Sequence, residues 1–502
     1  MAKSLFVKKP LSILLGEAED SEKGLKRTLT AGSLIALGIG AIIGAGLFVR
    51  TAAAAANNAG PAVTIGFIIA GVGCALAGLC YAEFASMIPI AGSAYTYSYA
   101  TMGEFIAWII GWDLVLEYAL GAATVSIAWS EYLNKLLGYF NTSIPYEWSH
   151  SPFEHNAAGV TGIMNLPALF ILILLTLLLI KGTRESAFVN GIIVVTKVAI
   201  VILFIVFGWS YINPVNHTPY IPSSTDAVIG ADGISRVGVY MDSQHIPHSF
   251  GGILGILGAA GVVFFAFIGF DAVSTAAQEA KNPKKNMPIG ILGSLAICTV
   301  LYILFSYVLT GVASTEDFRT AGKEASVTYA IQTYMPGYEW LAKLVTVAIL
   351  AGFSSVILVM LLGQSRVFYS MSHDGLLPKI FADIHPKFRT PYKSNIILFL
   401  FVGLFAAFIP GDIAGDMTSI GTLFAFILVC AGVMVMRKTD PNAPRQFKTP
   451  LVPVVPILGI IVCGAMIFGL GWPNWSRLLL WLVVGVIIYF GYSAKHSRLR
   501  NP

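Results

Sequence analysis

The sequence predicts an all-α membrane protein with twelve transmembrane helices. Hydrophobic residues make up 56% of the 502-residue chain, whereas charged residues make up only 11%. A soluble domain typically has about a quarter of its residues charged. Apolar stretches recur along the whole chain, and a stretch of about 20 residues crosses a hydrocarbon layer of about 30 Å as a helix.

Twelve apolar segments account for the predicted spans. In chain order they are residues 31–50, 62–88, 104–132, 163–181, 187–208, 250–277, 288–312, 341–370, 395–410, 415–436, 451–470 and 476–493. Several exceed the length that a bilayer requires, which indicates tilt or helix that continues beyond the membrane. The first thirty residues are polar, and no cleavable signal peptide is expected in them.

The distribution of Lys and Arg predicts that both termini are cytoplasmic. If the N-terminus is placed inside, the inner segments carry 23 of the 31 Lys and Arg residues, the outer segments carry seven, and Lys197 lies within a span. Cytoplasmic loops of membrane proteins carry such an excess. We therefore expect a multi-pass protein of the plasma membrane with a cytoplasmic N-terminal segment (1–30) and a cytoplasmic tail (494–502).

The first predicted span contains a sequence that weakens a helix. Gly38, Gly40, Gly44 and Gly46 fall within nine residues, and each glycine costs a helix about 1 kcal/mol relative to alanine. A break at membrane depth is tolerated where the backbone is buried in protein or lines a cavity. The alternative interpretation is a helix-packing face made of small residues.

The sixth predicted span contains a second interruption, in the sequence FFAFIGFD (264–271). Asp271 follows Gly269 closely and precedes a new helical run. An acidic side chain at this depth is costly unless it is paired or caps exposed N–H groups. Asp271 is therefore expected either to cap a restarting half-helix or to titrate.

Interruptions in the first and sixth spans indicate an inverted repeat of five plus five helices. The two repeats would be residues 31–208 and 250–436, with two appended helices in 451–493. Glycine-interrupted segments at matching positions of two halves indicate a transporter binding site near the membrane midplane. Half-helix N-termini bind anions and freed carbonyls bind cations, so such a site would suit a zwitterionic α-amino acid.

The interrupted segments also resemble the amino acid–polyamine–organocation superfamily, and most closely its cationic amino acid transporter branch. The stretches that carry the resemblance are GIGAIIGAGLFV (38–49), YAEFASMIPIAGSAYTYSY (81–99), GWDLVLEY (111–118) and FFAFIGFDAVSTAAQEAKNPKKNMPIGI (264–291). The resemblance covers residues 30–495. It implies a LeuT-type fold with ten core helices and two appended ones.

The resemblance further implies a substrate held between the two breaks. Backbone N–H groups at residues 44–46 would bind the carboxylate, and carbonyls of Ile42, Phe265 and Ile268 would bind the amine. Phe265 would also cover the site as an aromatic gate. The implied substrate-binding residues are Ile42, Ile43, Gly44, Ala45, Gly46, Phe264, Phe265, Ala266 and Ile268, with Val115, Tyr118 and Met360 around the substrate side chain. For the last three residues, ordinary core packing is the competing interpretation.

Lys197 is the main candidate for coupling transport to an ion. It lies mid-span, and a lysine in such a place is a functional hypothesis by default, with snorkelling to the outer surface as the alternative. In sodium-coupled relatives, hydroxyls of a segment resembling Ser354 and Ser355 hold a sodium ion beside the first span. In proton-coupled relatives, a lysine of the fifth span occupies that place.

Two acidic residues of the third span, Asp113 and Glu117, share one helix face because they are four positions apart. Either one of them pairs with a structural partner such as Lys197, or Glu117 selects cationic substrates. Glu117 is rotated by about 100° from Tyr118 on an ideal helix, so it is not expected to be the main substrate ligand. The predicted proton-coupling residues are Lys197, Glu117, Asp271, Ser354 and Ser355.

The sequence therefore predicts secondary active uptake of L-amino acids by alternating access, driven by proton symport. Small neutral amino acids such as alanine are the expected substrates, because the implied pocket is mostly apolar. The alternatives are transport of Arg and Lys, sodium symport, amino acid exchange, or a membrane sensor that binds without transport. We expect no enzyme activity, no cofactor or metal and no nucleic acid partner. The five cysteines lie in apolar segments without metal-ligand spacing, and a partner subunit is left open.

Overall fold

The protein is all-helical, as predicted. The computed structural model describes residues 5–14, 16, 29–88, 90, 92–156, 158–181, 186–224, 250–321, 326–388 and 390–500. Within these ranges β-structure is limited to two isolated bridges, Leu29 with Ala280 and His155 with Thr161. Most of the predicted N-terminal segment (1–30) and most of the long connection 209–249 lie outside the described residues.

The helices are apolar enough for a multi-pass membrane protein. Eight helical stretches of the described chain are long and apolar enough to cross a bilayer: Gly46–Met87, Glu104–Gly138, Gly191–Tyr211, Gly252–Ala277, Pro283–Val312, Glu339–His373, Gly411–Thr439 and Trp472–His496. Four shorter apolar helices accompany them: Ala31–Ile42, Leu166–Lys181, Tyr392–Phe408 and Val454–Gly469. Every predicted span overlaps one of these segments.

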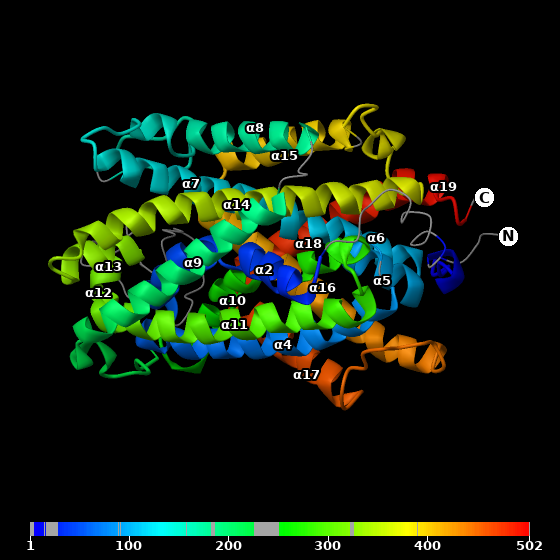
Figure 1. The fold of residues 1–502 in the computed structure, drawn as a ribbon, viewed down its shortest axis with the longest axis horizontal. Helices are drawn as coiled ribbons and strands as arrows, with labels where there is room; N and C mark the ends of the chain where they lie inside the picture. Colours follow the sequence, from blue (N-terminus) through cyan, green and yellow to red (C-terminus); the bar gives the residue numbers. More distant parts are fainter. Residues whose placement is uncertain are drawn as a thin grey trace.

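The long helices run side by side, with α8 and α15 together at one edge and α17 at the opposite edge (Figure 1). The helices of the first predicted repeat are α2 (Ala31–Ile42), α4 (Val63–Met87), α6 (Glu104–Val115), α7 (Gly121–Gly138), α8 (Leu166–Lys181) and α9 (Ser186–Gly208). Those of the second are α10 (Gly252–Phe264), α11 (Pro283–Val312), α14 (Glu339–His373), α15 (Tyr392–Phe408) and α16 (Gly411–Thr439). The appended helices are α17 (Val454–Gly469) and α18 (Trp472–Ile488).

Shorter helices lie at the two ends of this bundle. At one end, α5 (Ser93–Thr101) connects α4 to α6, and α19 (Ala494–His496) follows α18. At the other end, α12 (Thr315–Ala321) and α13 (Val327–Tyr334) connect α11 to α14. Both chain termini lie at the α5 end (Figure 1). The Lys9 ammonium is 2.7 Å from a carboxylate oxygen of Asp374, and the Arg498 amide donates to the Asp374 carbonyl.

The first predicted span is interrupted, as its glycines indicate. Helix α2 ends at Ile42, residue 43 is extended with ψ 105°, and a π-helical turn η1 (Gly46–Arg50) continues the chain. Helix α2 packs against α9, α11 and α14, so the break lies in the protein interior, where unpaired backbone groups can be paired by other helices.

The sixth predicted span is interrupted in the same way. Helix α10 ends at Phe264, a short 3-10 turn η8 (Phe265–Phe267) follows, and Ile268 is extended with ψ 137°. Gly269 has φ +108°, a conformation that residues with a Cβ atom rarely adopt. A second 3-10 helix, η9 (Asp271–Glu279), then begins. The third span has a milder irregularity, the π-helical turn η4 (Leu116–Leu120) between α6 and α7.

Candidate functional site

The two helix breaks touch each other through their backbones. A Cβ atom at Gly46 would overlap the backbone of Ala266, so the approach requires glycine at this position. On the other side of the contact, a Cβ atom at Gly269 would lie 3.1 Å from the carbonyl oxygen of Ala41. Each break thus has a glycine that admits the backbone of the other.

A tyrosine hydroxyl connects the two breaks. The Tyr302 Oη atom, from α11, lies 3.0 Å from the Ile42 carbonyl oxygen and 2.9 Å from the Ala266 carbonyl oxygen. A hydroxyl has one proton to donate, so the two carbonyls share it. The tyrosine is fully buried. Tyr302 was not predicted as a site residue. Its only sign in the sequence is a phenol hydroxyl in an apolar span, where such a group needs a polar partner.

Backbone N–H groups of the first break are placed to receive an anion. Gly44, Ala45 and Gly46 open the half-helix that follows the break, and the first amides of a helix have no intrahelical acceptor. The same positions attract negative charge, because the helix dipole adds to the free N–H groups. In the second break, the carbonyl of Phe265 accepts only a long hydrogen bond, from the Ile268 amide at 3.4 Å.

The side chains expected around the substrate are all buried. The buried set comprises Ile42, Ile43, Ala45, Val115, Tyr118, Phe264, Phe265, Ala266, Ile268 and Met360, each at most 4% exposed. A Cβ atom at Gly44 would lie 3.2 Å from Val356, and one at Gly121 would lie 2.8 Å from the Met360 sulfur. Helices α14 and α7 therefore contact this region, and it is sealed from solvent.

An ion pair lies beside the expected aromatic gate. Arg50, the last residue of η1, pairs with Asp416 of α16 and donates to the Asp412 carbonyl at 3.4 Å. Its guanidinium carbon is 5.7 Å from the centroid of the Phe265 ring. Neither Arg50 nor its pairing with Asp416 was predicted from the sequence. The only sign of this ion pair in the sequence is that Arg50 and Asp416 each lie near the end of a predicted span.

Lys197 reaches the first break from α9. Its ammonium donates to the Gly40 carbonyl at 2.8 Å, and its Cε atom lies 2.6 Å from the Cβ position of Gly352 on α14. The glycine therefore makes room for the lysine. The Ser354 hydroxyl bonds instead to the Leu350 carbonyl of its own helix, at 2.9 Å, and Ser355 is buried on the same turn.

The expected pairing of Lys197 with Asp113 or Glu117 is wrong in this structure, because the ammonium binds the Gly40 carbonyl instead. Within the described residues, the carboxylate oxygens of Asp113 and Glu117 have no hydrogen-bond donor. Both residues are fully buried. Burying a carboxylate without a hydrogen-bond partner costs free energy. The position of Asp113 and Glu117 in the interior therefore indicates a role beyond packing.

Asp271 begins the helix that follows the second break. It is the first residue of η9, and the backbone amides of Asp271 and Ala272 interact with its carboxyl. The Tyr118 hydroxyl donates to its Oδ2 atom. Glu117 also faces Asp271. The rotation between Glu117 and Tyr118 about the helix axis is not the value of about 100° expected for an ideal α-helix. Both residues lie in the π-helical turn η4, which has more residues per turn than an α-helix.

Comparison with known proteins shows which family and which relatives the chain resembles. A family model described as amino acid permease matches residues 29–492. The chain is 42% identical to the branched-chain amino acid permease BcaP of Bacillus subtilis, over 100% of both chains. It is 41% identical to the methylthioribose transporter of the same organism, over 99% of this chain and 100% of the relative. Vacuolar cationic amino acid transporter 4 of Arabidopsis thaliana is 33% identical, over 84% and 65% of the two chains.

Replacing Tyr302 with Phe tests whether the bridging hydroxyl organises the site. The change keeps the ring but leaves the Ile42 and Ala266 carbonyls without their donor. Losing one hydrogen bond of this kind is expected to weaken substrate affinity about tenfold. Affinity is measured by ligand-dependent thermal stabilisation of the purified protein. Tyr307→Phe, on the same helix, is the matched control, and equal affinities for the two variants would contradict the assignment.

Proposed function

Because the chain belongs to the amino acid permease family, we propose that it is a proton-coupled importer of neutral L-amino acids that works by alternating access. The proposal includes twelve membrane crossings, a LeuT-type arrangement with both termini in the cytoplasm, and a substrate site between the two breaks. The observation that carries it is the backbone contact between the breaks at Gly46 and Ala266, joined by Tyr302.

The contact supports binding of a zwitterion. The amides at residues 44–46 would bind the substrate carboxylate at the start of a half-helix. The Phe265 and Ile268 carbonyls, at the end of the opposite half-helix, would bind the ammonium. The Ile42 carbonyl, which the resemblance assigns to the ammonium together with these two, already accepts from Tyr302. A carbonyl oxygen has two lone pairs, so the substrate would share Ile42 with the tyrosine.

The side-chain pocket favours an apolar substrate. Val115, Phe265 and Met360 are apolar, and the substrate side chain would lie among them. Alanine fits such a pocket, and the similarity to the branched-chain amino acid permease of B. subtilis extends the proposed range to branched-chain amino acids. Within this proposal, Asp271 is not a free ligand for the side chain of Arg or Lys, because Tyr118 donates to it.

A second candidate substrate comes from the methylthioribose transporter, which is nearly as similar as the amino acid permease. Methylthioribose has neither a carboxylate nor an ammonium group. It would leave both half-helix ends at the breaks without the charges that they are placed to bind, and unpaired buried polar groups are costly. The amino acid is therefore the preferred substrate, and methylthioribose is the first competitor to test.

Lys197 is the proposed coupling group. Protonated, it donates to the Gly40 carbonyl and holds α2 against α9 and Gly352. Deprotonated, it keeps only two N–H donors and loses the charge that strengthens this hydrogen bond. Helix α2 would then be free to move, so release of the proton and opening toward the cytoplasm would go together. We propose that Glu117 and Asp271, which face one another beside Tyr118, form a second binding site for the proton.

The two ends of the molecule supply the gates that alternating access requires. The Arg50–Asp416 pair closes the site on the α12 side, next to the Phe265 ring. At the opposite end, the Lys9–Asp374 pair joins the N-terminal segment to α14. We propose that one gate opens while the other stays closed, so that substrate and proton cross together.

Competition for uptake tests the proposed substrate class. Liposomes containing the purified protein are given an inward proton gradient and labelled alanine. Unlabelled alanine, valine, leucine and isoleucine are each expected to compete, because all present the same zwitterionic head and an apolar side chain. Arginine, lysine and methylthioribose are expected to compete weakly. Competition by methylthioribose alone, without the amino acids, would reject the proposed carboxylate and ammonium sites.

Replacing Lys197 with Ala tests the coupling role. The variant is expected to lose pH-driven accumulation of alanine, because the proton-dependent bond to Gly40 is absent. Alanine exchange at equal internal and external pH should be at least partly retained, because the residues at the breaks are intact. Lys343→Ala, a lysine on α14 at the other end of the bundle, serves as control. If the Lys197 variant still concentrates alanine like the control, another group couples the proton.

A further inference from the structure

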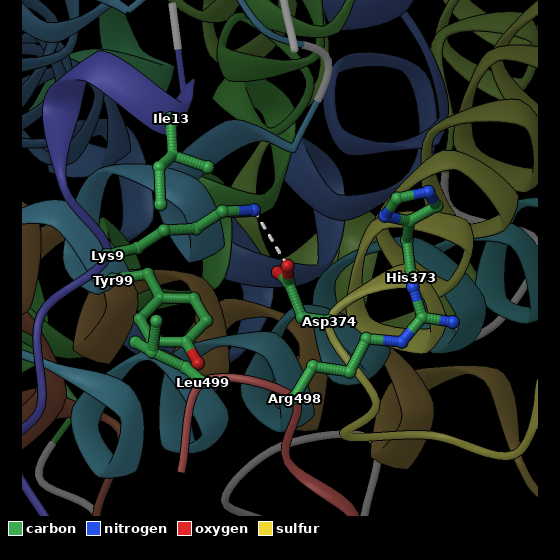
Figure 2. Close-up of a pocket in the computed structure, with 7 residues that line it drawn as sticks. All are labelled: Lys9, Ile13, Tyr99, His373, Asp374, Arg498 and Leu499. Carbon is green, nitrogen blue, oxygen red and sulfur yellow. Dashed lines mark hydrogen bonds and ion pairs between the residues drawn. The ribbon is translucent and has the colours of Figure 1, made fainter. Parts of the chain in front are cut away.

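The two terminal segments of the chain meet at one end of the bundle. Lys9, from the N-terminal segment, and Arg498, from the C-terminal one, line the same pocket beside Asp374 at the end of α14 (Figure 2). We call residues 493–500 the C-terminal strap. It comprises the last residue of η12 (Tyr489–Ser493), α19 and the residues that follow. The strap carries the chain from α18 across the end of α14.

Side-chain and backbone contacts fix the strap to the residues that follow α14. The Ser493 hydroxyl donates to the Leu376 carbonyl at 2.7 Å. Further along the strap, the carbonyl oxygen of His496 occupies the place that a Cβ atom of Gly375 would need. Gly375 has φ +83°, so the lack of a Cβ atom allows both this backbone conformation and the close approach. The strap is therefore docked so closely that a single added methyl group would displace it.

The N-terminal segment is docked in the same way at the start of α6. The Glu104 amide donates to the Val7 carbonyl at 3.0 Å. A Cβ atom at Gly103, which has φ +94°, would lie 2.6 Å from the carbonyl oxygen of Phe6. Each terminal segment thus lies against a glycine whose neighbour in the sequence is acidic.

These two acidic residues each bind both terminal segments. The Asp374 carboxylate accepts from the Lys9 ammonium at 2.7 Å, and the Asp374 carbonyl accepts from the Arg498 amide at 3.0 Å. Glu104 donates its amide to the N-terminal segment, and its fully buried carboxylate accepts from the Ser497 hydroxyl of the strap. Displacing one segment therefore disturbs both residues that position the other.

We propose that the C-terminal strap controls release of the N-terminal segment, and so sets how readily the inner gate opens. The inference rests on the proposed transport function, in which the N-terminal segment must leave Asp374 when the site opens toward the cytoplasm. While the strap is docked, Asp374 and Glu104 are held in the positions that bind the N-terminal segment. When the strap is displaced, both residues lose a contact that fixes them, and local opening of the N-terminal segment becomes more frequent.

Hydrogen exchange of the purified full-length protein, followed by mass spectrometry of its peptides, tests this coupling. Gly375→Ala places a methyl group where the His496 carbonyl lies, so it is expected to displace the strap without changing a charge. Gly337→Ala is the matched control, because Gly337 has φ +85° and no described atom lies within 4 Å of its Cβ position. Both variants carry similar backbone strain, and only the first meets the strap.

The peptides that decide the test come from residues 5–14. Gly375→Ala is expected to speed their exchange about tenfold, the equivalent of one lost hydrogen bond, whereas Gly337→Ala stays within about twofold of the unmodified protein. Faster exchange of the strap with unchanged exchange of residues 5–14 would show that the two segments are independent, and would overturn the proposal.

A second pair of variants keeps the test decisive if Gly375→Ala does not fold. Ser493→Ala removes the hydrogen bond to the Leu376 carbonyl and adds no group. Ser476→Ala, on α18, is its control, because the Ser476 hydroxyl bonds to the nearby Pro473 carbonyl. Faster exchange of residues 5–14 in Ser493→Ala alone supports the proposal, and equal exchange in this pair contradicts it.

The exchange measurement needs no substrate, so it is independent of whether the protein carries alanine. In liposomes, Gly375→Ala is expected to raise the external alanine concentration for half-maximal uptake severalfold relative to Gly337→Ala, because fewer molecules face outward. Faster exchange with unchanged uptake would confine the strap to anchoring the termini and overturn its control of the gate. Failure of the unmodified protein to take up alanine would instead reject the proposed function.

Discussion

The structure depends on the close contact between two broken helices. An α-helix in a bilayer normally satisfies its own backbone, and interrupting two of them leaves amides and carbonyls that must be paired in the interior. Gly46 and Gly269 let the breaks approach at backbone distance, and Tyr302 donates between carbonyls of both. The proposed site is thus made mainly of main-chain groups. These groups would bind the α-carboxylate and α-ammonium of an amino acid without a charged side chain of the protein.

The other polar groups of the interior are arranged around this contact. Lys197 bonds to the Gly40 carbonyl on the half-helix that precedes the first break, whereas Arg50 ends the turn that follows it and pairs with Asp416. Movement of this one interrupted helix would therefore change both the lysine bond and the Arg50–Asp416 ion pair. In the proposed transport cycle, this linkage would connect loss of a proton at Lys197 to opening of a gate.

The class of fold and the positions of the breaks could be predicted from the sequence because they are local properties. Apolar length indicates a span, and glycines such as Gly44 and Gly46 weaken it where they occur. The partners of single side chains could not be predicted in this way. Arg50 and Asp416 are far apart in sequence, and nothing in the sequence around Tyr302 indicates its two carbonyl partners. For Lys197 the sequence left two partners open, the first span and the acids of the third, and the structure shows the first. Asp271 begins a helix, as its sequence indicates, but its hydrogen bond from Tyr118, more than 150 residues earlier, could not be predicted.

In the proposed transport cycle, an amino acid bound at the breaks crosses the membrane together with a proton. The most direct test loads liposomes containing the protein with a pH-sensitive dye and adds alanine outside, with no imposed pH gradient. Symport predicts that the interior becomes more acidic as alanine enters, and that liposomes without protein show no change. Entry of labelled alanine without any acidification of the interior would contradict the claim.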